Sequence, residues 1–109
     1  MHRDKRRADA ASVPQRVAFE VAELESVRRL ERTLPIVVGR SSLADVPLLD
    51  AEVSRRHARF DSEDGFVYVT DLGSRNGTYL NGQRIAESIE VRLGDTIDIG
   101  NVRLTVAQL

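Results

Sequence analysis

The sequence contains no cysteine and no tryptophan among its 109 residues. The lack of cysteine excludes disulfides, thiolate metal ligands and cysteine nucleophiles. It also fits a reducing compartment, so we expect the protein to be cytoplasmic. No apolar run approaches the roughly 18 residues of a membrane span. The basic N-terminus is not followed by the apolar core of a secretory signal. We therefore expect a protein without a membrane association.

The sequence also lacks a charge excess, because 16 Lys and Arg face 17 Asp and Glu, for a net charge of −1. A broad basic face for nucleic acid or anionic lipid is not expected from that balance. Basic residues prevail only in residues 1–16, which hold almost no large apolar side chain and predict a disordered tail. Any weak binding of this tail to nucleic acid or membrane should disappear near physiological salt.

Residues 17–109 predict one all-β domain, since short segments of alternating polarity are separated by Gly, Pro, Asp and Asn. About eleven short strands closing into an antiparallel β-sandwich are expected. Pro47 restricts its strand to a sheet edge, and Asn81-Gly82 predicts a tight hairpin turn. A short helix over 23–30 is a lower-ranked alternative. The expected strands are 17–24, 28–34, 36–38, 46–49, 57–60, 66–69, 78–80, 83–85, 89–91, 96–99 and 102–106.

Three longer loops, 39–42, 52–57 and 71–78, are rich in hydrogen-bond donors. A phosphorylated side chain brings about −1.5 to −2 charges and three acceptor oxygens. Guanidinium groups, short hydroxyls and backbone amides are the donors that satisfy such oxygens. The loops therefore predict a phosphate-binding pocket. Its candidate donors are Arg40, Arg55, Arg56, Arg75, Ser41, Ser54, Ser74 and Asn76.

The order and spacing of these motifs across about 17–109 resemble the forkhead-associated (FHA) domain. The quoted motifs are Gly39-Arg40, Ser54-Arg55-Arg56-His57-Ala58, Asp71-Leu72-Gly73-Ser74-Arg75-Asn76-Gly77-Thr78 and Asn81-Gly82. The resemblance implies an eleven-stranded β-sandwich whose loops at one end bind phosphothreonine peptides. It further implies phosphate contacts from Arg40, Ser54, Arg55 and Arg75, and a peptide-backbone contact from Asn76.

Six residues are expected to support the binding loops: Gly39, His57, Gly73, Gly77, Asn81 and Gly82. His57 follows Ser54 by three residues, which also suggests a base beside a nucleophile. We prefer a buried structural imidazole bonded to loop backbone, because no acid or oxyanion motif accompanies the pair. Arg56 is expected to be structural or to lie at the rim, and Ser54 has a turn-forming alternative.

Glu52 stands two residues before Ser54 in the same loop. Its carboxylate is a specificity candidate, because it would disfavour acidic residues C-terminal to the phosphothreonine and favour basic or apolar ones. The alternative is a glutamate that faces solvent.

The expected function is a signalling adaptor that binds a Thr-phosphorylated protein downstream of a Ser/Thr kinase. The partner should act in trans, because residues 1–16 contain no threonine. A phospho-independent interaction module of the same fold is the alternative. No enzymatic activity, cofactor or metal site is expected. The acidic turn at 61–64 is interpreted as a solvated loop, and a weak calcium site there is the lower-ranked alternative. We expect a monomeric domain.

Overall fold

The computed structural model describes residues 15–109, which form eleven strands and their connecting loops, and it confirms the all-β fold. The strands are β1 (Arg16–Glu23), β2 (Ser26–Thr33), β3 (Ile36–Gly39), β4 (Val46–Pro47), β5 (Ala58–Glu63), β6 (Phe66–Asp71), β7 (Thr78–Leu80), β8 (Gln83–Arg84), β9 (Ile89–Val91), β10 (Thr96–Ile99) and β11 (Val102–Gln108). Residues 1–14 of the expected tail lie outside the described range, whereas Arg16 already pairs in β1. No helix between residues 15 and 109 is long and apolar enough to cross a membrane.

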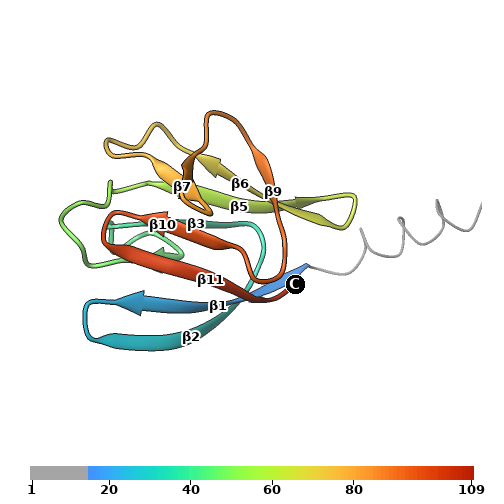
Figure 1. Cartoon of the computed structure of the whole chain (residues 1–109), viewed down its shortest axis with the longest axis horizontal. Coiled ribbons are helices and arrows are strands. Elements are labelled where there is room, and N and C mark those ends of the chain that lie inside the picture. The colour runs from blue at the N-terminus through green and yellow to red at the C-terminus, as the bar shows by residue number, and fades with distance from the viewer. Residues whose placement is uncertain (1–14) are drawn as a thin grey trace, which may run out of the picture.

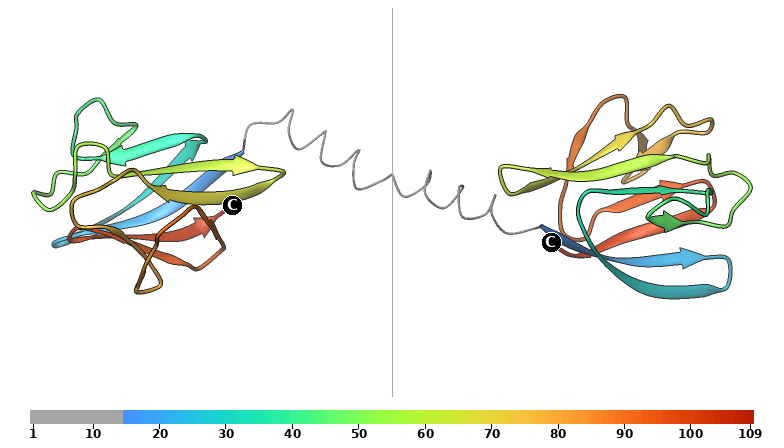
Figure 2. Two further views of the ribbon diagram at one scale, coloured as in Figure 1. Left: turned by 90° about the horizontal axis from the view of Figure 1, so that it is seen from above. Right: turned by 180° about the vertical axis from the view of Figure 1, so that it is seen from behind.

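The strands form two sheets packed face to face (Figures 1 and 2). One sheet has the order β2-β1-β11-β10-β7-β8 and the other β4-β3-β5-β6-β9. β3 and β4 pair in parallel, whereas the other paired strands run antiparallel. Pro47 lies in the edge strand β4, as expected from its missing backbone donor.

Alternating side chains of β1 enter the space between the sheets. Phe19 of β1 meets Phe60 of β5 there, with ring centroids 4.9 Å apart at an interplanar angle of 57°. These rings join the two sheets through one apolar core. The helical alternative for 23–30 is wrong, because β1 and β2 pair in register up to Glu23 and Ser26 and reverse through a two-residue turn.

Five connections lie at one end of the sandwich, at the left of Figure 1. They are the β1–β2 and β10–β11 turns and the β3–β4, β4–β5 and β6–β7 loops. We call this end the loop end. The β5–β6 turn and the C-terminus lie at the opposite end. The three donor-rich loops therefore share one end, as the sequence predicted.

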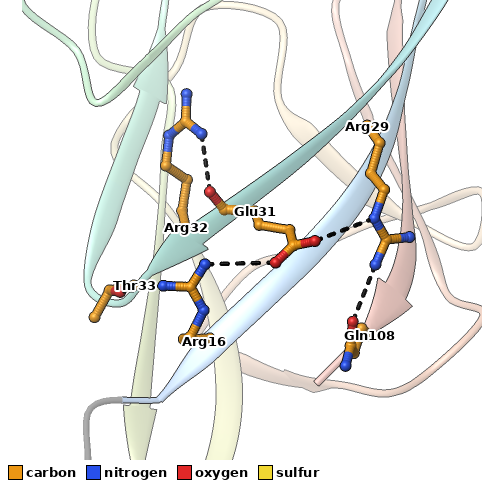
Figure 3. A network of polar contacts seen from close by, with 6 residues as sticks. All are labelled: Arg16, Arg29, Glu31, Arg32, Thr33 and Gln108. Carbon is orange, nitrogen blue, oxygen red and sulfur yellow. Dashed lines mark hydrogen bonds and ion pairs between the residues drawn. The ribbon is translucent and has the colours of Figure 1, made fainter.

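The outer face of β1 and β2 carries a network of polar side chains away from these loops (Figure 3). Glu31 accepts from Arg16 and Arg29, each at 3.4 Å. Arg29 also donates to the side chain of Gln108 at 3.0 Å, and Arg16 to Thr33 at 3.1 Å. The basic side chains of this face thus have partners within the domain.

Candidate functional site

Arg40 follows β3 directly and is held by hydrogen bonds to the β4–β5 loop. Its backbone N–H donates to the carbonyl of Ser54 at 2.9 Å, and its Nε donates to the carbonyl of Val53 at 3.0 Å. These bonds fix the direction of the guanidinium. Its two terminal nitrogens have no hydrogen-bond or ion-pair partner within residues 15–109. Arg40 therefore presents an oriented pair of donors to a ligand.

Gly39 makes this close approach of the two loops possible. A Cβ at Gly39 would lie 2.1 Å from the carbonyl oxygen of Arg55 and 3.0 Å from that of Ser54. Both are backbone atoms and cannot rotate away. A side chain at Gly39 would therefore push the segment around Ser54 away from Arg40.

Ser54 links its own loop to the β6–β7 loop. Its hydroxyl oxygen accepts a hydrogen bond from the backbone N–H of Arg75 at 2.9 Å. A hydroxyl has one donor hydrogen besides its acceptor lone pairs. Because Ser54 is used here as an acceptor, its hydrogen remains available for a ligand oxygen.

His57 is fully buried and connects both loops. Its Nδ1 accepts from the backbone N–H of Ser54 at 3.1 Å, so its Nε2 carries the hydrogen and donates to the carbonyl of Gly77 at 2.8 Å. No hydrogen bond joins the imidazole to the Ser54 hydroxyl within the described chain. The imidazole therefore bridges the two loops through backbone groups, and its contacts place no base beside the Ser54 hydroxyl.

Asp71 organises the β6–β7 loop from the end of β6. Its carboxylate accepts from the backbone N–H groups of Gly73 at 3.0 Å and Ser74 at 2.9 Å, and from the hydroxyls of Ser74 and Thr78. Burial raises the pKa of the Asp71 carboxyl, but the hydrogen bonds from Ser74 and Thr78 outweigh burial and hold the pKa below its ordinary value.

Ser74 was a candidate ligand donor, and its contacts argue against that role. Its hydroxyl donates to Asp71 and accepts from the backbone N–H of Gly77 at 2.9 Å. The single hydroxyl hydrogen is therefore already used. Residue type alone does not distinguish Ser74 from Ser54, because only the fold shows which hydroxyl hydrogen is occupied.

Asn76 and Glu52 touch each other across the two loops. The Asn76 side-chain nitrogen donates to the backbone carbonyl of Glu52 at 2.8 Å and to its carboxylate at 3.2 Å. The amide oxygen of Asn76 has no partner among the residues described. Glu52 therefore does not simply face solvent, and it borders the group expected to bind a peptide backbone.

Arg55, Arg56 and Arg75 are exposed around these groups. None of their guanidinium groups forms an ion pair within residues 15–109. Sequence reasoning missed Arg84 of β8, whose side chain lies against the backbone of Gly77. A Cβ at Gly77 would lie 2.7 Å from its Nε. No sequence signal marked Arg84, because its place depends on the β7–β8 pairing.

The remaining predicted support residues divide between the two ends. Gly73 and Gly77 have φ angles of 74° and 89° in the β6–β7 loop, where a side chain would be strained. Asn81 and Gly82, with φ angles of 49° and 85°, form the expected turn after β7, away from the loop end. The Asn81 side chain bonds Asp95 and the backbone N–H of Thr96. Asn81 thus joins the β7–β8 turn to the start of β10, and its side-chain hydrogen bonds involve no residue of the donor cluster.

A protein-family model, that of the FHA domain, matches residues 36–100. The chain belongs to the FHA domain family. The match includes all three donor-rich loops. This FHA domain is 36% identical over 70 residues to the FHA domain-containing protein FhaB of Mycobacterium tuberculosis. That alignment covers 64% of the chain and 45% of the relative. It is 46% identical over 66 residues to the glycogen accumulation regulator GarA of Mycolicibacterium smegmatis. That alignment covers 61% of the chain and 41% of the relative.

These matches span less than half the length of either relative. Among solved structures, one from a structural and functional analysis of phosphothreonine-dependent FHA domain interactions has a TM-score of 0.77 and 27% identity. The alignment covers 87% of this FHA domain and 98% of that chain. The similarity therefore includes strands and loops outside the family-model match.

At the loop end of the FHA domain, the guanidinium groups of Arg40, Arg55, Arg56 and Arg75 form no ion pair within residues 15–109. Arg40 and Ser54 lie on neighbouring segments joined by backbone bonds, and Arg75 is joined to Ser54. No three His, Asp or Glu side chains converge on a possible metal site in residues 15–109. The arrangement is suited to binding an anion with several acceptor oxygens.

Proposed function

We propose that this FHA domain binds phosphothreonine in a partner protein at its loop end and acts as a signalling adaptor. The observation that carries the proposal is the pair formed by Arg40 and Ser54. Arg40 is locked in direction while its terminal nitrogens stay unpaired within residues 15–109, and Ser54 keeps its hydroxyl hydrogen. Two preorganised donors on adjoining segments suit a phosphate, which offers three acceptor oxygens.

Each site residue has a distinct role in the proposal. Arg40 and Ser54 bind phosphate oxygens, while the Arg75 guanidinium adds positive charge and Arg55 adds a backbone or side-chain contact beside them. Asn76 binds the peptide backbone through its free amide oxygen, and through its nitrogen when the peptide displaces the Glu52 carboxylate. Arg56 stays at the rim.

Threonine should be preferred over serine if its methyl group is buried beside Asn76. One buried methyl contributes roughly 0.8 kcal/mol, which is less than a tenfold change in affinity. A larger preference requires that phosphoserine also lose hydrogen-bond geometry. The comparison of both peptides therefore measures how well the pocket fits the methyl group.

The proposed partner binds in trans after phosphorylation by a Ser/Thr kinase, and we expect this interaction in the cytoplasm. The domain contributes recognition, without catalysis. Loop arginines with unpaired terminal nitrogens support this function over a phospho-independent one, in which the partner would dock on a sheet face.

The test is a fluorescence titration at physiological salt with a degenerate phosphothreonine peptide library and its phosphoserine and unphosphorylated counterparts. Wild type should bind phosphothreonine at micromolar or tighter concentration. The other peptides, and the Arg40→Ala variant, should bind at least tenfold more weakly, about 1.4 kcal/mol. Arg56→Ala is the matched control and should change affinity little. Binding that ignores phosphorylation or Arg40→Ala would contradict the proposal.

A further inference from the structure

The most exposed of the large apolar side chains lie at the loop end. The four most exposed in residues 15–109 are Leu24, Leu43, Leu49 and Val27, with 99%, 93%, 85% and 71% of their surface accessible. All four lie in loops or strand ends at the loop end. Single exposed apolar residues are ordinary, but apolar side chains gathered around polar groups mark interaction surfaces.

Leu24 and Leu49 line the same groove, which has a volume of about 320 Å³. Leu24 comes from the β1–β2 turn and Leu49 from the β4–β5 loop. Val102, at the start of β11, adds a further apolar surface. The groove thus has room for one aliphatic side chain between two leucines that the core does not use.

Local folding does not account for the leucine at position 24. Leu24 has a φ of 45°, in the left-handed region that glycine and asparagine adopt more readily. Its side chain packs into no core cluster and is almost wholly accessible. A turn selected for stability alone would place a different residue there.

The β4–β5 loop connects the groove with the proposed phosphate site, because it carries both Leu49 and Ser54. Asp50 accepts from the backbone N–H of Val53 at 3.0 Å, one residue before Ser54. The Asp50 carboxylate accepts from the backbone N–H of Asn101 at 2.9 Å and from its side chain at 3.2 Å. One braced segment therefore carries a wall of the groove and the phosphate-binding hydroxyl.

The charges at the groove differ from those at the phosphate site. Its lining includes Glu23, Glu25 and Asp50, with no basic residue. Glu23 pairs with Arg28, whereas Glu25 has no ion-pair partner in the described part of the chain. A ligand entering this groove would gain from a positive charge near its apolar side chain.

We propose that the groove between Leu24 and Leu49 is a second docking site for the phosphorylated partner. It takes an aliphatic side chain of leucine, isoleucine or methionine type, next to an arginine or lysine, from the segment that carries the phosphothreonine. This inference rests on the proposed function. It assigns selectivity to residues outside the motifs that carry the phosphate-binding prediction.

The test is a positional-scanning peptide library with one fixed phosphothreonine and randomised positions on both sides. The variant is the double substitution Leu24→Asn and Leu49→Asn, because asparagine tolerates the left-handed turn at 24. Leu93→Asn is the matched control: Leu93 is 66% exposed and lies beyond β9, away from the loop end. Urea unfolding checks that the variants remain folded.

Wild type and Leu93→Asn should enrich an aliphatic residue at least threefold at one position, with a basic residue beside it. The double variant should lose that enrichment and still bind phosphothreonine in an Arg40-dependent way. The absence of aliphatic enrichment in wild type, or equal enrichment in the double variant, would overturn the proposed docking in the groove. Neither result would contradict the phosphate site. Failure of wild type to bind any phosphothreonine peptide would overturn both.

Discussion

His57 and Gly77, twenty residues apart in the chain, are joined by a hydrogen bond of 2.8 Å from the imidazole Nε2 to the backbone carbonyl. The other ring nitrogen accepts from the backbone N–H of Ser54. One buried ring therefore sets the spacing between the loop that carries Ser54 and the loop that carries Asn76. The neutral imidazole serves both bonds, since one nitrogen accepts and the other donates.

Replacing His57 by alanine should destabilise the domain by about 2–4 kcal/mol. The substitution leaves a cavity and removes the partners of the Ser54 N–H and the Gly77 carbonyl. Urea unfolding followed by fluorescence or circular dichroism measures the change. Arg56→Ala, at the exposed neighbouring position, should stay within about 0.5 kcal/mol of wild type. Equal stability of the two variants would contradict the bridging role.

Gly39→Ala should destabilise the domain by about 1–3 kcal/mol, because the new Cβ meets the Arg55 carbonyl. It should also weaken phosphothreonine binding by about tenfold or more, since Ser54 must move away from Arg40. Gly82→Asn is the control: nothing lies within 4 Å of a Cβ there, and asparagine tolerates its positive φ. Phosphothreonine binding by Gly39→Ala with wild-type affinity would contradict the role of Gly39 in holding Ser54 beside Arg40.

Asp71 predicts a specific dependence of stability on pH. Its folded-state pKa lies below the ordinary value of 3.8. The charged carboxylate therefore stabilises the fold fully above that value, and its contribution is lost as pH falls through the folded-state pKa. Asp71→Asn should lower the free energy of unfolding at pH 7 by about 1–3 kcal/mol.

Urea midpoints at pH 7, 5, 4 and 3 test this dependence. The difference between wild type and Asp71→Asn should be constant from pH 7 to 5 and should narrow below about pH 4. Asp61→Asn provides a control carboxylate in β5 that bonds Arg59 near the surface. A difference for Asp71→Asn that grows toward low pH would reverse the assigned sign.

Glu52→Ala should relax the charge preference of the site. Peptides with acidic residues C-terminal to the phosphothreonine should gain about two- to fivefold in affinity relative to basic ones, because an exposed like charge is removed. Glu52→Gln removes the charge but retains an acceptor for the Asn76 side chain. Equal effects of both variants assign the preference to charge. Unchanged preferences across an acidic-to-basic peptide series would eliminate it.

Much of the strand pattern follows from local sequence. Alternating Val17, Phe19 and Val21 predicted the inward face of β1, and the Asn81-Gly82 turn adopted its expected positive φ angles. Pro47 marked an edge strand because it lacks a backbone donor. These features depend on neighbouring residues and are accessible without the fold.

Other features depend on contacts between distant segments. The pairing of Glu52 with Asn76 joins residues 24 apart, and the different uses of the Ser54 and Ser74 hydroxyls depend on how their loops meet. The left-handed Leu24 departs from the residue types that usually signal such a turn. These features of the loop end could not be predicted from the sequence, because local residue patterns do not show how distant segments meet.

Amide chemical shifts, mapped while a phosphothreonine peptide from the library is titrated into the isotopically labelled domain, show where the peptide binds. The largest changes are expected at Arg40, Ser54, Arg75 and Asn76, with little change on the outer faces of the two sheets. The same titration with the unphosphorylated peptide should leave these four amides unmoved. Changes concentrated on a sheet face, or produced equally by the unphosphorylated peptide, would contradict a phosphothreonine site at the loop end.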